Sequence, residues 1–183
     1  SQYRRTVAMV EAGGDAYLLD VFRVRGGQEH DYLIHGLGDC TVQTRRIVLG
    51  EPHPGTLAGD EVPFGTAPTE GPDNGYEYLS APRYAQPQGA FSVGWVQPSG
   101  QALWFHALDG VAQQAVVADA EPELRPEAYK SIQYLILRNT GENLSSTFAG
   151  VLEAVHDKRV VRSVRRLKPA EAPEGTVAVS VLL

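Results

Sequence analysis

The chain has 183 residues, a formal net charge of −6, 43% hydrophobic residues and 21% charged residues. This composition is that of a folded globular protein and excludes a disordered one. The acidic balance argues against a general nucleic-acid binder or a protein of anionic membrane surfaces. The only cysteine, Cys40, excludes an internal disulfide, and no run of about 18 apolar residues predicts a membrane span. We therefore expect one domain, residues 1–183, with a substantial core.

Short apolar segments separated by turn residues follow one another along the chain, which is typical of an antiparallel sandwich or barrel. The first two segments, 3–10 and 16–25, flank a Gly-Gly turn and predict a hairpin. Further strands are expected at 30–35, 41–49, 91–97, 102–108, 114–118, 131–138, 145–155, 160–167 and 176–183. The sequence thus predicts an all-β protein, a large antiparallel β-sandwich of about eleven strands.

Two segments depart from this strand pattern. Pro122–Tyr129 has the composition of a single helical turn. Gly50–Gly75 contains six glycines and five prolines among 26 residues, which excludes a regular strand or helix. Long irregular segments in compact domains are usually functional or disordered. We expect this one to be an ordered but irregular excursion across one end of the sheets.

The two ends of the sequence both carry strand patterns. The first pattern starts at Tyr3 with no segment before it, and the last runs apolar to Leu183. A domain seldom stops in the middle of a strand. We therefore expect the chain to be a piece of a larger protein and, by itself, to catalyse no reaction.

The segment His30–His35, His-Asp-Tyr-Leu-Ile-His, concentrates polar side chains in one predicted strand. His30 and Asp31 should point to opposite faces of this strand, and Asp31 and His35 should lie about 13 Å apart on one face. Zinc needs ligands at about 2 Å, so this spacing disfavours a metal site. A structural role for these residues is the first interpretation, and substrate contact by His30, Asp31, Tyr32 and His35 stays open.

Other candidate chemistries are weaker. The sequence contains no Gly-x-Ser-x-Gly elbow, and Asp39 beside Cys40 disfavours a thiolate nucleophile. Trp95 is expected in the core, and Trp104 is a candidate platform for a sugar ring. A basic run is expected either to protect a strand edge or to contact an acidic ligand or partner domain. It consists of Lys158, Arg159, Arg162, Arg165, Arg166 and Lys168.

Several segments, read in order from Tyr3 to about residue 167, resemble the C-terminal β-sandwich of heparinase II/III-like polysaccharide lyases. The segments are Tyr3–Thr6, Tyr17–Val24, Gly26-Gly27, His30–Tyr32, Arg138–Gly141, Leu144–Phe148, Val151–Glu153 and Ser163–Leu167. None of them is a catalytic signature by itself, so the resemblance rests on the ordered set.

This resemblance implies a specific biological setting. Such lyases cleave uronate-containing polysaccharides by β-elimination, and a helical toroid supplies the tyrosine base and most of the cleft. The sandwich would pack against that toroid in a secreted or periplasmic bacterial protein. The expected partners are therefore the toroid and an acidic polysaccharide, with a homo-oligomer as another way to cover an apolar face. The resemblance implies no cofactor in this chain and assigns any divalent metal to the parent protein.

The sequence departs from the family at its histidine motifs. The family's sandwich opens with a His-x-His segment and has a further His-Asn pair, and this sequence contains neither. β-Elimination needs a neutralised carboxylate, a base and an acid, and no catalytic residue is carried over here. Two alternatives stay open: a self-sufficient carbohydrate-binding module, for which Trp104 is the first residue to check, and a structural interaction domain without a ligand.

Overall fold

The computed structural model describes residues 2–12, 14–36, 38–69, 74–120, 131–173 and 175–183. Within these ranges the protein consists of twelve strands and one short 3₁₀-helix, which confirms the all-β class. The strands are β1 (Gln2–Ala12), β2 (Asp15–Arg25), β3 (Glu29–His35), β4 (Thr41–Arg45), β5 (Ser80–Ala85), β6 (Phe91–Val96), β7 (Ala102–Ala107), β8 (Gln114–Ala120), β9 (Ile132–Thr140), β10 (Ser145–Val155), β11 (Ser163–Leu167) and β12 (Ala178–Leu182). The helix is η1 (Tyr76–Tyr78).

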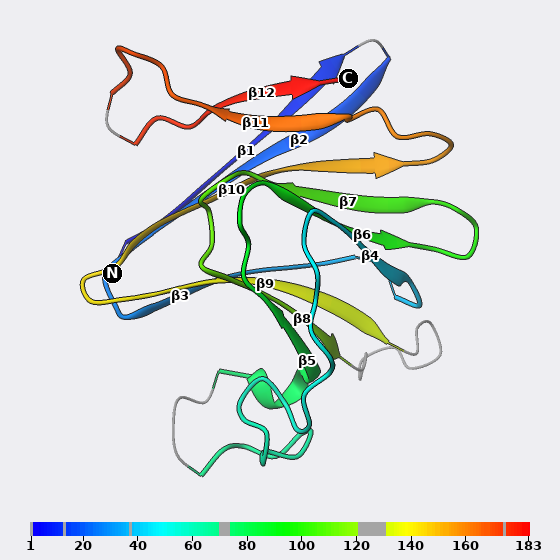
Figure 1. Ribbon diagram of the computed structural model, residues 1–183, viewed down its shortest axis with the longest axis vertical. Helices are drawn as coiled ribbons and strands as arrows, with labels where there is room; N and C mark the ends of the chain where they lie inside the picture. The colour runs from blue at the N-terminus through cyan, green and yellow to red at the C-terminus, as the bar shows by residue number, and fades with distance from the viewer. Residues whose placement is uncertain (1, 13, 37, 70–73, 121–130, 174) are drawn as a thin grey trace.

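Two antiparallel sheets form the body of the protein. The larger sheet has the strand order β1-β2-β10-β7-β6-β4, and the smaller has the order β3-β9-β8-β5. The smaller sheet lies below the larger one in Figure 1. The expected first hairpin is confirmed, with Ala12 opposite Asp15 and Gln2 opposite Arg25 along the full length of β1 and β2.

The core lies between the two sheets, where alternate side chains of each strand point inward. Tyr32 of the smaller sheet stacks on Phe105 and Phe148 of the larger one, with ring centroids 5.7 and 5.9 Å apart. Gly150 in β10 is required by this packing, because a Cβ at this position would collide with the ring of Phe105. Trp95 is buried, as expected, and its indole N–H donates to the carbonyl of Gln133 at 2.8 Å.

The Gly/Pro-rich segment covers a sheet face, not the end of the sheets where it was expected. Leu57 and Leu79 pack on Val116 and Ile136 of the smaller sheet, and the Leu57 N–H donates to the Leu79 carbonyl at 2.7 Å. The physical reason is that β8 and β9 carry apolar residues on both faces. The outward set needs a cover, which this segment provides.

Strand boundaries differ most from the prediction at three places. β5 was not predicted, and it contains Pro82; it forms an edge of the smaller sheet, where a missing N–H is tolerated. β4 ends at Arg45 because Arg46 has a φ of 61°, which cannot continue a strand. β11 begins at Ser163, three residues later than expected. The predicted helical turn at Pro122–Tyr129 lies outside the described residues.

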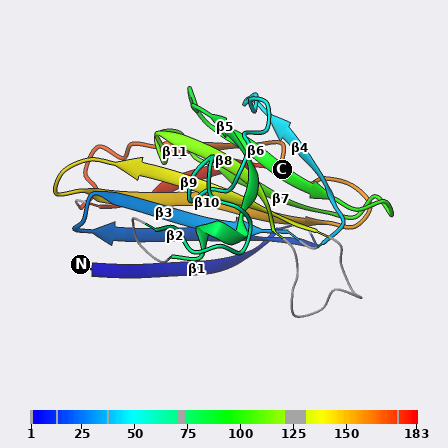
Figure 2. The same ribbon diagram turned by 90° about the horizontal axis from the view of Figure 1, so that it is seen from below.

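The hairpin of β11 and β12 covers the outer face of the larger sheet. Val164, Val177 and Val179 pack against the core cluster that includes Val21 and Ala149. The guanidinium of Arg23 donates to the carbonyl of Gly175 at 2.8 Å and so ties the segment between β11 and β12 to β2. Seen from below, β1 runs along one margin of the molecule (Figure 2).

Candidate functional site

His30 and Tyr32 point into the sandwich. His30 is buried, and its ring nitrogens lie 2.9 Å from the Ser146 hydroxyl and 2.6 Å from the Gly26 carbonyl. The Tyr32 hydroxyl donates to Asp20 at 2.8 Å. Burial raises the pKa of Tyr32, and the hydrogen bond to Asp20 raises it further. Both side chains therefore serve the core in this structure.

Asp31 and His35 lie on the outer face of β3, on the side opposite to His30, as the strand spacing predicted. Asp31 accepts two hydrogen bonds from the Arg138 guanidinium, at 2.9 and 2.6 Å, and a third from the Tyr76 hydroxyl. The ring of His35 packs against that of Tyr134 in a tilted arrangement, with 4.7 Å between the ring centroids. Asp31 therefore connects η1 to the smaller sheet, and the structure does not bring it together with His35.

Asp31 gives a testable measure of this structural role. Replacing Asp31 with asparagine is expected to lower the free energy of unfolding by about 1–3 kcal/mol, because the partly buried Arg138 loses a charged acceptor. The matched control is Asp157→Asn at an exposed position, and chemical denaturation measures both. Equal stability of the two variants would contradict the structural assignment.

Trp104 is buried, although a sugar-stacking role needs an open ring. Its side chain is 3% exposed. The guanidinium carbons of Arg159 and Arg45 lie 4.2 and 5.0 Å from its ring centroid. These cations cover the ring, so Trp104 offers no accessible platform for a sugar in this structure.

A buried polar chain beside Trp104 was not anticipated. The Ser92 hydroxyl lies 2.9 Å from Nδ1 of His106, and Nε2 of His106 lies 3.2 Å from Oε2 of Glu153. Glu153 also accepts the backbone N–H groups of Val160 and Val161. Burial alone would raise the pKa of Glu153, but the hydrogen bonds from His106 and from these N–H groups outweigh burial and hold the pKa below its usual value.

The order Ser–His–Glu is that of a hydrolase triad, yet the surroundings do not suit a substrate. His106 is 3% exposed and Glu153 is 1% exposed. Both Glu153 oxygens are already engaged, with His106 on one and the backbone of 160–161 on the other. This row of hydrogen-bonded side chains therefore fixes the segment after β10 to the larger sheet.

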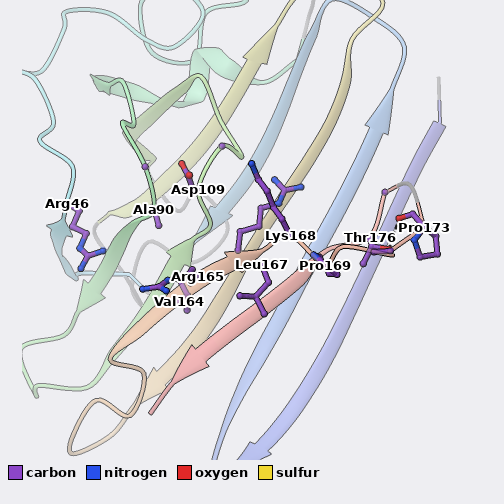
Figure 3. A pocket seen from close by; sticks show the side chains of 15 residues that line it. Arg46, Ala90, Asp109, Val164, Arg165, Leu167, Lys168, Pro169, Pro173 and Thr176 are labelled. Atoms are coloured by element: carbon purple, nitrogen blue, oxygen red, sulfur yellow. Dashed lines mark hydrogen bonds between the residues drawn. The ribbon is translucent and has the colours of Figure 1, made fainter.

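A charged cavity of about 670 Å³ lies between the β11–β12 hairpin and the ends of β4, β6 and β7. Four cations line this cavity, and Asp109 is the only carboxylate among the lining residues that the structure describes. In Figure 3, Arg46 and Arg165 extend toward it from different walls. The four cations are Arg46, Arg165, Arg166 and Lys168.

A second cavity, of about 570 Å³, is adjacent to the first, because Gly175 and Thr176 line both. It lies over the ends of β1, β2 and β10, and its charged lining residues are Arg4, Arg23 and Arg25. We call the two cavities together the basic trough. Its lining residues lie at or near one end of each strand of the larger sheet and on the β11–β12 hairpin.

The arginines of the second cavity are held close together by the strand register. Arg4 and Arg23 are directly opposite each other on β1 and β2, where like charges destabilise a sheet. The ion pairs found among the described residues do not include Arg4, Arg23 or Arg25. A bound anion would relieve the repulsion between these side chains.

Sequence reasoning found only part of the trough. The basic run supplied Arg165, Arg166 and Lys168, for which an acidic ligand was one interpretation. Arg4 and Arg23 were missed, although the register of the predicted first hairpin already places them opposite each other. The contribution of Arg46 was not predictable, because it depends on where β4 ends.

Comparisons with known proteins add no assignment. No protein-family model and no curated protein sequence matches this chain. Among the described residues, no group of three or more His, Cys, Asp or Glu side chains is placed to hold a metal ion. The same part of the chain contains no helix long and apolar enough to cross a membrane.

Proposed function

We propose that this β-sandwich binds an acidic polysaccharide along the basic trough. The observation that carries the proposal is the separation of charge. Among the described residues, seven cations and one carboxylate line the trough, although the whole chain has a net charge of −6. Arginine suits such a ligand because its planar guanidinium pairs with carboxylate and other oxyanions through two hydrogen bonds.

The lining of the trough favours an acidic polysaccharide over other ligands. Within the part of the chain that the structure describes, no tryptophan, tyrosine, phenylalanine or histidine lines it. Single-stranded nucleic acids are usually bound by stacking their bases on aromatic rings. Flat rings also serve neutral sugars, whose apolar faces they cover. A ligand held by charge alone, with anionic groups repeated along a chain, fits this surface better.

We further propose that the domain serves a heparinase II/III-like polysaccharide lyase as a binding and supporting part. The support is the ordered sequence resemblance together with a trough suited to uronate or sulfate groups. β-Elimination also needs a base at the carbon next to the carboxylate. The described lining residues of the trough include no tyrosine or histidine, so its role in this proposal is to hold substrate while another part of the parent protein provides the base.

The test compares two double variants that remove the same charge from the same basic run. Arg165→Gln/Lys168→Gln alters the trough, whereas Lys158→Gln/Arg162→Gln alters cations that do not line it. Titration calorimetry with a heparan sulfate oligosaccharide should show about a tenfold loss of affinity for the first variant, which corresponds to about 1.4 kcal/mol. The second variant should bind nearly as well as the unaltered chain, and binding should weaken as salt is added.

The outcomes separate the alternatives. Equal weakening of both variants would mean that affinity follows overall charge and not the trough. Tighter binding to single-stranded DNA than to the oligosaccharide would indicate a nucleic-acid site. An absence of binding to sulfated and to uronate-rich oligosaccharides would refute the proposed function. An ultraviolet assay for unsaturated uronate products, run on the same samples, checks whether the domain alone cleaves the ligand.

A further inference from the structure

Two arginine side chains from distant segments lie over the indole ring of Trp104 on the larger sheet. Arg159 comes from the segment after β10, and its guanidinium carbon lies 4.2 Å from the ring centroid. Arg45 comes from β4, and its guanidinium carbon lies 5.0 Å from the same centroid. The ring itself lies over Gly94, where a Cβ would be 2.5 Å from two of its atoms. The indole therefore forms a floor on which two cations meet.

The charge on Arg45 has no described counter-charge. Arg45 is exposed, and the ion pairs found among the described residues do not include it. Arg159 has one such pair, with 3.5 Å between its Nε and Oε2 of Glu153, which is longer than an ordinary N–H···O hydrogen bond. The same Nε is buried and has no hydrogen-bond partner in the described part of the chain. The two cations therefore share one carboxylate.

The two guanidiniums repel each other. Burial lowers the pKa of Arg159, and the charge of Arg45 lowers it further, against the opposing effect of Glu153. The strand β4 and the segment after β10 hold both side chains over the same ring, so the repulsion cannot be relieved by moving the backbone of either apart. An oxyanion that accepts hydrogen bonds from both guanidiniums relieves it.

We propose that Arg45 and Arg159 bind one tetrahedral oxyanion, a sulfate or phosphate group, above the ring of Trp104. Each guanidinium presents a planar fork of N–H donors that pairs with two oxygens. A carboxylate has only two oxygens, and a single fork engages both. The second guanidinium needs the further oxygen that a sulfate or phosphate group provides. The apolar indole below keeps water from one side of the site, which strengthens the hydrogen bonds to the anion.

The position of this site beside the basic trough identifies the source of the oxyanion. Arg46, the next residue after Arg45, lines the first cavity of the trough, and its φ of 61° ends β4 at that point. This step rests on the proposed function: the group is a sulfate substituent of the polysaccharide that lies in the trough. The domain then discriminates sulfated uronate chains from unsulfated ones.

Inorganic sulfate tests the oxyanion site by itself. Sodium sulfate should change the tryptophan fluorescence of the unaltered chain relative to sodium chloride at equal ionic strength, because the anion binds directly above Trp104. Arg45→Gln should abolish this response, and Arg45→Lys should weaken it because lysine lacks the planar fork. Arg162→Gln removes the same charge at another exposed site and should respond like the unaltered chain. An absent response to sulfate, or an equal response in Arg45→Gln, overturns the proposal.

Stability separates this binding role from a structural one. Without sulfate, Arg45→Gln should leave the denaturation midpoint unchanged or raise it, because the repulsion on Arg159 is removed. A lower midpoint together with an unchanged sulfate response would show that Arg45 only covers the ring of Trp104, and would refute the oxyanion site.

Calorimetry with two oligosaccharides distinguishes this inference from the proposed function. Arg45→Gln should bind a heparan sulfate oligosaccharide about tenfold more weakly than the unaltered chain does, and should bind an unsulfated hyaluronan oligosaccharide equally well. Equal weakening for both ligands contradicts the sulfate assignment. If the unaltered chain binds neither oligosaccharide, the proposed function fails, whereas a fluorescence response that depends on Arg45 still supports the oxyanion site, with a free inorganic anion as its ligand.

Discussion

Replacing Glu153 with alanine is expected to lower the free energy of unfolding by about 3–5 kcal/mol, the usual effect of breaking a buried charged network by removing one partner. The carboxylate is 1% exposed and accepts hydrogen bonds from His106 and from the N–H groups of Val160 and Val161. Its loss leaves these buried donors without an acceptor and removes a side-chain link between β10 and the segment 160–161. Chemical denaturation measures the change.

The same residue predicts a dependence of stability on pH. The folded protein holds the pKa of Glu153 below its usual value, through the hydrogen bonds that outweigh the effect of burial. The stabilisation is therefore fully present above the pKa that Glu153 has in the unfolded chain, about 4.3. It is lost as the pH falls through the lower pKa that Glu153 has in the folded protein. Glu153→Gln should show a weaker loss of stability in this acidic range than the unaltered chain.

A control distinguishes this network from a general effect of acidic residues. Glu142 is exposed in the turn between β9 and β10, and Glu142→Ala should change the unfolding free energy by less than about 0.5 kcal/mol. If Glu153→Ala is no more destabilising than Glu142→Ala, the buried network does not stabilise the fold and the contacts of Glu153 are incidental.

The sheets were predictable because the sequence alternates with the period of a strand. Val93 and Trp95 on β6 are inward-facing residues of such an alternating pattern, and both are buried. The first hairpin was predictable in register as well, from the Gly-Gly turn. β5 was hidden because Pro82 reads as a strand breaker, and only its edge position makes the proline acceptable.

The candidate site was less predictable because it is assembled from segments far apart in sequence. Arg46 and Arg4 follow or belong to the two opposite edge strands of the larger sheet, β4 and β1, and Arg165 comes from the β11–β12 hairpin. The alternation of faces placed Asp31 away from His30, but it could not reveal that Arg138 holds Asp31. Strand periodicity gives the face of a residue, whereas its neighbours depend on topology.

Trp104→Ala is expected to be the other strongly destabilising change, at about 3–5 kcal/mol. The side chain is almost fully buried beneath Arg45 and Arg159, so its removal leaves a cavity and two cations without the ring they cover. Gly94 lies against the same ring: a Cβ at this position would be 2.5 Å from two ring atoms of Trp104. Gly94→Ala should therefore destabilise the protein by about 1–3 kcal/mol, although alanine has no unfavourable backbone angle to adopt there.

The two changes should not be additive. Once Trp104 is alanine, the atoms that a Cβ at Gly94 would meet are gone, so most of the effect of Gly94→Ala should disappear in the double variant. Gly89→Ala is the matched control, because a Cβ there meets nothing closer than 3.9 Å and should change stability little in either background. A Trp104→Ala protein of unaltered stability that no longer binds the oligosaccharide would show instead that the ring is a ligand platform, and would return the sugar-stacking interpretation to this position.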